Sequence, residues 1–377
     1  MRKEMKLIAA AILLALVGCS PQQFDKDQPV RIGIPAPLSG GSAEYGEFMR
    51  QGATLAADEI NARGGISGKR LELEFEDSQG QPAEAVNAAE KLITRDRVNV
   101  VTCAFNSSAT LAVAEVAKRE GVPLVVGLST ADGITGPAHP IVFRVCAPNT
   151  TLAELLGDYI AQLERPSTIA YVFEKTDFGT NLADVVRRRL ENAGIKTTNS
   201  EGVNQHETDF LSLITKLKAS RPDMVFLAVL ADSALPFLRQ AQQAGFHSKW
   251  ANAVSLSSPK FLEEAGKSAS GFIGITHFDA ATAEGQARSF VEHFRSKYGQ
   301  APTHYSAVYY DTINLIAVAL TRGGIAPEKL SEALKTTDFA GITGRIRFDQ
   351  NGQAHIGTII FRWENGKMTI IKTNPGS

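Results

Sequence analysis

The stretch VNVVTCAFNSSATLAVAEVAKREGVPLVVGLS, residues 98–129, holds two short apolar runs separated by a longer mixed segment. The runs at 98–105 and 122–129 are rich in β-branched residues and predict strands. Between them, residues 108–119 place their apolar side chains at helical spacing. Apolar strands separated by a helix of this length indicate a parallel sheet covered on both faces. The stretch therefore predicts an α/β fold.

The same alternation extends toward the N-terminus and up to Pro148. The predicted strands are VRIGIPA (30–36), RLELEFED (70–77) and VFRVCA (142–147), and the predicted helices are 45–62 and 82–95. The first of these helices ends at Gly64-Gly65, a favourable C-terminal stop.

The pattern starts again after Pro148. Strands are predicted at 167–174, 197–203, 223–230, 249–254 (KWANAV) and 271–277, with helices at 152–163, 182–193, 209–219 and 233–244. Because the two blocks are similar in length and order, we expect two similar lobes, each a parallel-type sheet flanked by helices. Two further helices, 283–298 and 305–321, precede a β-rich tail (GRIRFD, IGTIIFRW, KMTIIK). The late position of this tail is best explained if the chain crosses between the lobes more than once.

The charge balance and the metal-ligating residues exclude several classes of function. The 377 residues include 39 Lys and Arg against 40 Asp and Glu, a formal net charge of −1, which gives no support for a nucleic-acid partner. Three cysteines are too few for a disulfide-rich scaffold or a four-thiolate metal site. The seven histidines are scattered without an i, i+4 pair, so no metal site is predicted.

The first twenty residues, MRKEMKLIAAAILLALVGCS, do not belong to the fold. A positive start precedes an apolar run from Leu7 to Val17, which would make about 16 Å of helix against a bilayer core of roughly 30 Å. This pattern is typical of a secretory signal. The ending Leu16-Val17-Gly18-Cys19 also resembles the bacterial lipobox, which implies a signal peptide at 1–18 and acylation of Cys19. An ordinary cleaved signal with an incidental cysteine is the alternative.

Residues 19–28 are polar and unpatterned, so we expect a tether between the membrane and the folded part. The predicted location is periplasmic or otherwise extracytoplasmic, with lipid on Cys19 as the membrane contact. In that oxidising compartment Cys103 and Cys146 both follow apolar strands. They are interpreted as two buried thiols, with a disulfide between them as the alternative.

Motifs for catalysis and for cofactors are incomplete. GGISGKR (64–70) lacks the glycine spacing of a phosphate loop and has Arg70 where Ser or Thr should follow the lysine. Residues 127–131 (GLSTA) lack the last glycine of a nucleophile elbow, and no acid–histidine pair follows in an obvious arrangement. No G-x-G-x-x-G follows the first strand, and no cofactor is predicted. The sequence favours binding, with an exported hydrolase as a weaker alternative.

Small polar residues gather where three predicted strands end: 37–40, 106–110 and 129–130. Ligands of open α/β sheets collect at such carboxyl ends of strands. The hydroxyl groups, among them those of Ser107 and Ser108, can simply cap free helix amides. Together with backbone N–H groups and the helix dipole, they can instead bind an anion such as a carboxylate. A site of this kind has no base or nucleophile and suits recognition without turnover.

Nine segments, in order, are similar to the type I periplasmic solute-binding proteins, the branch typified by the leucine/isoleucine/valine-binding protein of branched-chain amino-acid importers. They are PLSGGSAEYG (37–46), DEINARGGISGKRLELEFED (58–77), SSATLAVAEVAKREGVPLV (107–125), VFRVC (142–146), TDFGTNLADVV (176–186), TDFLSLITKLKASRPDMVFLA (208–228), RQAQQAGF (239–246), YYDTINLIAVAL (309–320) and GITGRIRFDQNG (341–352). The resemblance implies two lobes joined by a three-segment hinge and a ligand enclosed by closure. It also implies an ABC importer whose permease and ATPase subunits are separate chains.

The resemblance assigns roles to residues of the first lobe. Ser107 matches the serine whose hydroxyl holds the ligand carboxylate, and Thr130 matches the threonine that assists at carboxylate and amine. Leu128 matches a position that contributes backbone. Tyr45 matches an aromatic residue that closes over the ligand.

The assignments for the side-chain pocket and the second lobe depart from the family pattern. Phe105 and Asn106 are expected to line the pocket, and Phe178 falls where the family commonly has tyrosine. The family's acid for the ligand ammonium should fall near Val254, which is apolar here. Candidates for a substitute acid are Asp232, Glu174 and Asp177.

The resemblance predicts an N-terminal lobe at 29–147 plus 276–353 and a C-terminal lobe at 148–275 plus 354–377. The predicted ligand is a small carboxylate-bearing molecule, either an amino acid or a related apolar or aromatic carboxylate. A ligand-sensing protein of the same fold, which reports to a receptor, is the alternative from another functional class.

Overall fold

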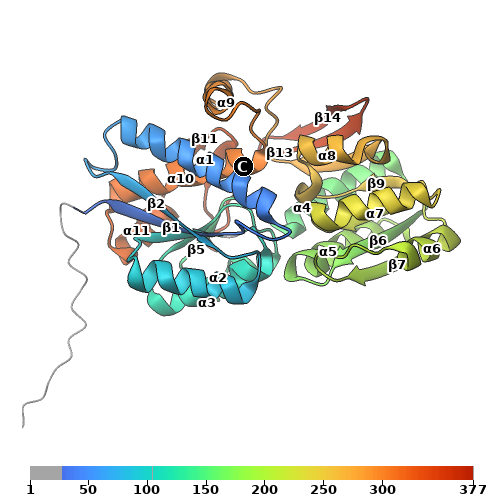
Figure 1. Cartoon of the computed structure of the whole chain (residues 1–377), viewed down its shortest axis with the longest axis horizontal. Coiled ribbons are helices and arrows are strands. Elements are labelled where there is room, and N and C mark those ends of the chain that lie inside the picture. The colour runs from blue at the N-terminus through green and yellow to red at the C-terminus, as the bar shows by residue number, and fades with distance from the viewer. Residues whose placement is uncertain (1–27, 104, 377) are drawn as a thin grey trace, which may run out of the picture.

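The computed structural model describes residues 28–103 and 105–376. The predicted signal peptide, Cys19 and the tether up to residue 27 lie outside the described residues. Two α/β lobes lie side by side, the first around β1 to β5 and the second around β6 to β9 (Figure 1). No helix within the described residues is both long enough and apolar enough to cross a membrane.

The first lobe is built on a five-stranded sheet of order β2-β1-β3-β4-β5 in which every neighbouring pair is parallel. Its strands are β1 (Val30–Ala36), β2 (Leu71–Asp77), β3 (Val100–Cys103), β4 (Leu124–Val126) and β5 (Val142–Arg144). Every residue of β3 and β4 is buried. Their continuous apolar sequence is what a strand covered by helices on both faces requires.

The second lobe contains a seven-stranded sheet of order β14-β13-β10-β9-β8-β6-β7. Its strands are β6 (Thr168–Glu174), β7 (Lys196–Val203), β8 (Met224–Ala228), β9 (Lys249–Ala251), β10 (Phe272–Thr276), β13 (Thr358–Glu364) and β14 (Lys367–Asn374). The pairs from β7 to β10 are parallel, whereas β13 and β14 run antiparallel to their neighbours. The two lobes therefore share one architecture, as predicted.

The helices cover the faces of these sheets (Figure 1). On the first lobe, α1 and α10 pack together on one face and α2 and α3 on the other. The helices are α1 (Ala43–Ala62), α2 (Pro82–Glu90), α3 (Ser107–Glu120), α4 (Asn149–Tyr159), α5 (Asp177–Asn192), α6 (Leu211–Ser220), α7 (Ala231–Gln243), α8 (Pro259–Ala265), α9 (Gly285–Tyr298), α10 (His304–Gly323) and α11 (Pro327–Lys335), and a separate hairpin is formed by β11 (Asp338–Gly341) and β12 (Gly344–Arg347).

The chain passes between the two sheets three times: after β5, after β10 and before β13. The first and third passages lie side by side, because Arg144 N donates to Gly352 O (2.7 Å) and Ala354 N donates to Arg144 O (2.9 Å). This arrangement confirms the expected three-segment connection and explains the late β-rich tail. The numerical limits of the two lobes stay a prediction.

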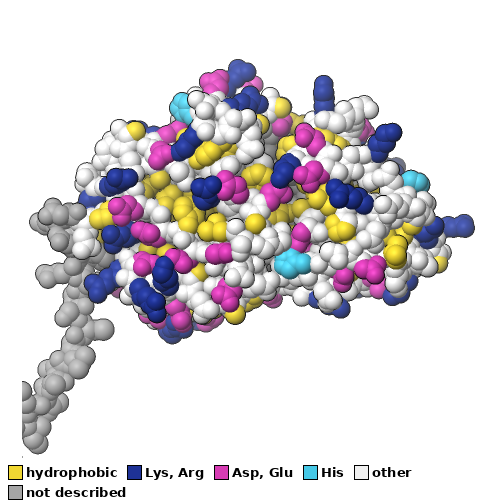
Figure 2. All heavy atoms as spheres, in the orientation of Figure 1, with side chains coloured by type: hydrophobic (Ala, Val, Ile, Leu, Met, Phe, Trp, Pro, Cys, Tyr) yellow, Lys and Arg dark blue, Asp and Glu magenta, His cyan; other side chains and the backbone are white. Residues whose placement is uncertain are grey.

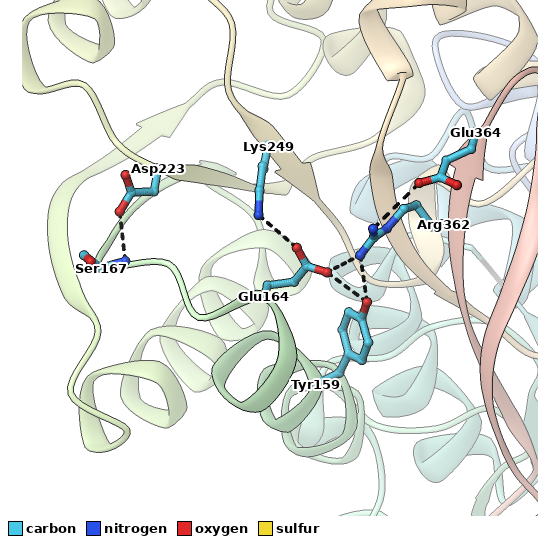
Figure 3. A network of polar contacts seen from close by, with 7 residues as sticks. All are labelled: Tyr159, Glu164, Ser167, Asp223, Lys249, Arg362 and Glu364. Atoms are coloured by element: carbon cyan, nitrogen blue, oxygen red, sulfur yellow. Dashed lines mark hydrogen bonds and ion pairs between the residues drawn. The ribbon is translucent and has the colours of Figure 1, made fainter.

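A polar cluster fixes the returning strand β13 to the second lobe (Figure 3). Glu164 lies at the end of the helical turn that extends α4; it accepts hydrogen bonds from Tyr159 and Lys249 and pairs with Arg362 of β13. Burial raises the pKa of Glu164, but these two donors and the charge of Arg362 outweigh it and hold the pKa below its ordinary value. Glu164 therefore stays ionised at neutral pH and ties the third passage in place.

The strand predicted at 249–254 is shorter in the structure. Strand β9 ends at Ala251, and Val254–Leu256 form a single 3₁₀ turn. The cause is the buried side chain of Asn252, which donates to the carbonyl of Leu227 and accepts from Leu256 N (3.0 Å). A local side-chain bond of this kind offers the backbone an alternative to the sheet ladder.

The two cysteines within the described residues, Cys103 and Cys146, are both free and fully buried. Burial raises the pKa of each thiol to about 12, so both stay protonated. The interpretation as two buried thiols is confirmed, because the structure has no disulfide between Cys103 and Cys146.

Candidate functional site

A cavity of about 230 Å³ lies between the lobes, where β3, β4 and β6 end. Its wall combines residues of both lobes with residues that follow the second passage of the chain. They are Gly80, Pro82, Phe105, Asn106, Ser107, Ser108, Leu128, Thr130, Cys146, Glu174, Lys175, Thr176, Phe178, Gln205, Leu230, Val254, Ser255, His277, His304 and Tyr305. The site thus occupies the carboxyl ends of parallel strands, as expected for open α/β sheets.

The hydroxyl groups of Ser107 and Thr130 lie at the first-lobe end of this cavity. Ser107 is the first residue of α3, and its Oγ accepts a hydrogen bond from Ala131 N (3.3 Å). Thr130 is 2 % exposed, and its Oγ1 has no hydrogen-bond partner within the described residues. The first-turn amides of a helix also lack partners inside that helix. This end of the cavity therefore offers hydrogen-bond donors to an anion.

Residues next to these hydroxyls form the rest of the first-lobe wall. Phe105 and Leu128 are buried and apolar, and Asn106 donates through Nδ2 to Ser42 Oγ (3.3 Å). Ser108 reaches the second lobe, since its Oγ accepts from Asp177 N at the start of α5 (3.1 Å). The structure thus brings the four predicted residues 105–108 to the cavity together with Leu128.

Tyr45 lies behind the wall of the cavity. Its ring stacks on that of Phe105 with centroids 3.9 Å apart. Its hydroxyl donates to Ser255 O (3.0 Å) and accepts from Ala231 N (3.0 Å), and both partners belong to the second lobe. The structure therefore places Tyr45 as a contact between the lobes that backs the pocket residue Phe105.

On the second lobe, Phe178 and Val254 lie on the wall, both nearly buried. Among the three candidate acids, the structure brings Glu174 to the wall. Asp232 instead pairs with His206, and Asp177 is exposed at the start of α5. Neither of these two is a wall residue.

Glu174 is 1 % exposed and ends strand β6. Its Oε1 accepts from Leu230 N (2.9 Å), whereas its Oε2 has no partner within the described residues. Burial raises the pKa of Glu174 to about 7, so near neutral pH the protonated and ionised forms are both populated.

Several wall residues have no place in the sequence prediction, above all His277 and His304. They lie 27 positions apart, after β10 and at the start of α10, so no local spacing marks them as a pair. Their ring centroids are 6.3 Å apart. The crossing of the chain between lobes, which spacing alone does not encode, is what brings them together.

The site is arranged for binding a small molecule. Throughout the described part of the chain, no group of three or more His, Cys, Asp and Glu side chains is placed to hold a metal ion. On the outer surface, acidic and basic side chains are interspersed over the visible face (Figure 2). A small cavity between two lobes, lined by both polar and apolar side chains, is typical of a ligand site.

Comparison with known proteins gives one consistent result. A family model described as "Periplasmic binding protein" matches residues 29–367. The leucine-, isoleucine-, valine-, threonine- and alanine-binding protein of Pseudomonas aeruginosa is 28 % identical over 352 residues, which cover 93 % of this chain and 94 % of that protein.

Solved structures agree with this match. The branched-chain amino-acid transporter substrate-binding protein LivJ of Streptococcus pneumoniae, in complex with isoleucine, superposes with a TM-score of 0.85 at 25 % identity, over 93 % of this chain and 99 % of that one. An ABC transporter substrate-binding protein of Sphaerobacter thermophilus gives a TM-score of 0.82 at 27 % identity, over 92 % and 98 % of the two chains.

Proposed function

The chain belongs to the periplasmic binding protein family, and we propose that it delivers a small carboxylate with an apolar or aromatic body to an ABC importer. It is a solute-binding protein that works outside the cytoplasm. The permease and ATPase subunits would be separate chains, and Cys19 would carry the lipid that holds the protein at the membrane. In this proposal the protein binds and releases its ligand without chemical change.

The observation that supports this ligand class is the division of the cavity wall. Ser107 and Thr130 present hydroxyl groups beside the first turn of α3, where an anion is favoured. The opposite wall also carries polar residues, but Phe178 and Val254 give it an apolar part. In our proposal the ligand carboxylate binds at the hydroxyl end, and its body packs against this apolar part.

Contacts between the lobes support enclosure of the ligand by hinge closure. Besides the bonds of Tyr45, Lys260 of α8 pairs with Glu44 of α1 (2.7 Å), and Asp132 N donates to Asn181 Oδ1 (3.1 Å). Closure excludes water, which strengthens the few polar contacts that orient a ligand. In our proposal these contacts belong to the closed arrangement.

An α-amino acid is the second candidate ligand, and two observations favour it. The relatives named above carry amino acids in their names, and Glu174 lies on the cavity wall. A buried ammonium without a counter-charge costs several kcal/mol. Glu174 would have to supply that charge, although burial holds its pKa at about 7.

A thermal-shift panel separates the two ligand classes. Each of leucine, valine and phenylalanine is paired with its deaminated analogue, 4-methylpentanoate, 3-methylbutanoate or 3-phenylpropanoate. We expect the analogues to raise the melting temperature more than the amino acids do, because Val254 stands where a counter-charge for the ammonium is expected. Tight binding confined to the amino acids would overturn this ligand class and favour the second candidate.

Lipid anchoring makes an independent prediction. Cys19 follows Gly18 at the end of the apolar run, so replacing it should remove the acylation site. We expect Cys19→Ala to move the protein from the membrane to the soluble fraction, measured by fractionation and by incorporation of labelled fatty acid. Ser20→Ala serves as the control. A Cys19→Ala protein that stays with the membrane, together with an unlabelled parent, would contradict the anchor.

A further inference from the structure

The imidazole of His277 is fixed in one tautomer by its surroundings. His277 is 4 % exposed, and its Nδ1 lies 3.0 Å from the carbonyl oxygen of Gly357. A carbonyl oxygen can only accept a hydrogen bond, so Nδ1 carries the proton. Nε2 is then a bare acceptor in the neutral ring, and within the described residues it has no partner. Burial lowers the pKa of His277 to about 4, which keeps the ring neutral.

The same reasoning applies to His304, which is 2 % exposed. Its Nδ1 lies 3.2 Å from Ser257 Oγ. The single hydroxyl hydrogen of Ser257 is donated to Val254 O (2.8 Å), so Ser257 must accept from Nδ1–H of His304. Nε2 of His304 is therefore also an acceptor, and it too has no partner among the described residues. Burial, and secondarily the nearby His277, lower the pKa of His304 well below its ordinary value.

His277 and His304, each with one neutral acceptor nitrogen that lacks a partner among the described residues, thus line one cavity, and their rings lie 6.3 Å apart. A buried acceptor without a partner costs free energy, and a donor that completes the hydrogen bond recovers it. Resting on the function proposed above, we propose that the ligand is a hydroxylated carboxylate whose hydroxyl group donates a hydrogen bond to Nε2 of His277 or His304. The hydroxyl end at Ser107 and Thr130 would take the carboxylate, and the imidazoles would select the second polar group.

Other groups that could bind to the two Nε2 atoms fit the residues of the cavity wall less well. Two imidazoles provide only half of the four ligands of a typical zinc site, and in the described residues no cluster of three potential ligands is present. An ammonium group is a donor as well, but neutral nitrogens do not supply the counter-charge that a buried cation needs. A hydroxyl group requires only an acceptor. A permanently bound water molecule is the remaining occupant, and the experiment below tests it.

The test measures dissociation constants by calorimetry for six related probes on the full extracytoplasmic protein. The probes are phenylacetate, mandelate, 4-hydroxyphenylacetate, 4-methoxyphenylacetate, phenylglyoxylate and phenylglycine. We expect mandelate or 4-hydroxyphenylacetate to bind at least tenfold more tightly than phenylacetate. The keto and methoxy compounds can only accept at the same position, so they should lose this gain because two acceptors would face each other.

Variants identify the residues that provide the selection. In His277→Asn and His304→Asn, the shorter side chain can still donate from the Nδ1 position to Gly357 O or to Ser257 Oγ, but the Nε2 acceptor is gone. We expect at least one of them to reduce the preference for the hydroxylated probe to threefold or less while phenylacetate binding changes little. His293→Asn, at an exposed histidine on α9, is the matched control and should keep the preference.

The outcomes separate this inference from the proposed function. Equal binding of phenylacetate and both hydroxylated probes would overturn the inference, because the nitrogens would then be satisfied by water, yet it would leave the carboxylate function standing. A preference confined to phenylglycine would also overturn it and would assign recognition to Glu174. A preference for the hydroxylated probe that persists in both His277→Asn and His304→Asn would overturn the inference as well. Absence of binding by all six probes would overturn the proposed ligand class and this inference with it.

Discussion

Replacing Thr130 by valine is expected to weaken binding of the carboxylate ligand roughly 10- to 100-fold, because a hydrogen bond to a charged group contributes about 1.5–3 kcal/mol. The same substitution should not destabilise the unliganded protein. Thr130 Oγ1 is buried without a partner in the described structure, so valine removes an unsatisfied hydroxyl while keeping the shape of the side chain. We expect a rise in unfolding free energy of about 1 kcal/mol.

A comparison with Ser107→Ala makes this prediction specific. Ser107 Oγ accepts from Ala131 N, so its loss should lower both affinity and stability. Affinity is measured by calorimetry with the tightest carboxylate of the panel, and stability by urea unfolding without ligand. Thr215→Val, at an exposed threonine of α6, is the control. If Thr130→Val destabilised the protein and left affinity unchanged, the hydroxyl would have a structural role and the carboxylate assignment would fail.

Replacing Arg144 by methionine is expected to cost about 3 kcal/mol or more of unfolding free energy. Arg144 is 1 % exposed and donates to Gln353 Oε1 (2.5 Å), Ala131 O (2.5 Å) and Ser129 O (3.4 Å). Methionine fills much of the space but removes three hydrogen bonds from a charged donor, at about 1.5–3 kcal/mol each. The acceptors keep only weaker, longer bonds, such as that from Ile134 N to Ala131 O (3.3 Å). Burial lowers the pKa of Arg144, but its ordinary value is high enough that the group stays charged.

The Arg144 variant should also bind ligand more weakly, since the guanidinium holds the carbonyls on both sides of Thr130. Its bond to Gln353 further links the first passage between the lobes to the third. Urea unfolding and calorimetry measure the two effects. Arg345→Met, at an exposed arginine of the β11–β12 hairpin, should change neither appreciably. An Arg144→Met protein as stable as the parent would show that the carbonyls find other donors and would refute this role.

Much of the fold could be predicted from the sequence because it depends on local patterns. The apolar runs that became β1, β3, β6 and β8 are separated by segments of helical periodicity, and such strands require a parallel sheet covered on both faces. The strand predicted at 249–254 failed where the Asn252 side chain bonds the backbone. That competition depends on the position of Leu227 in a neighbouring strand, which periodicity does not encode.

The same division applies to the site. The sequence by itself determined the hydroxyl end, because Ser107 and Thr130 lie shortly after two strands whose carboxyl ends must meet at one edge of the sheet. Only the tertiary structure decided the opposite wall. The chain crosses between the lobes three times, and these crossings bring Glu174, His277 and His304, which are up to 130 positions apart in the sequence, to one cavity. The tertiary structure also decided which nitrogen of each imidazole is the acceptor. The tautomers depend on Gly357 and Ser257, which are distant from His277 and His304 in the sequence. These partners become neighbours of the imidazoles only when the lobes are assembled.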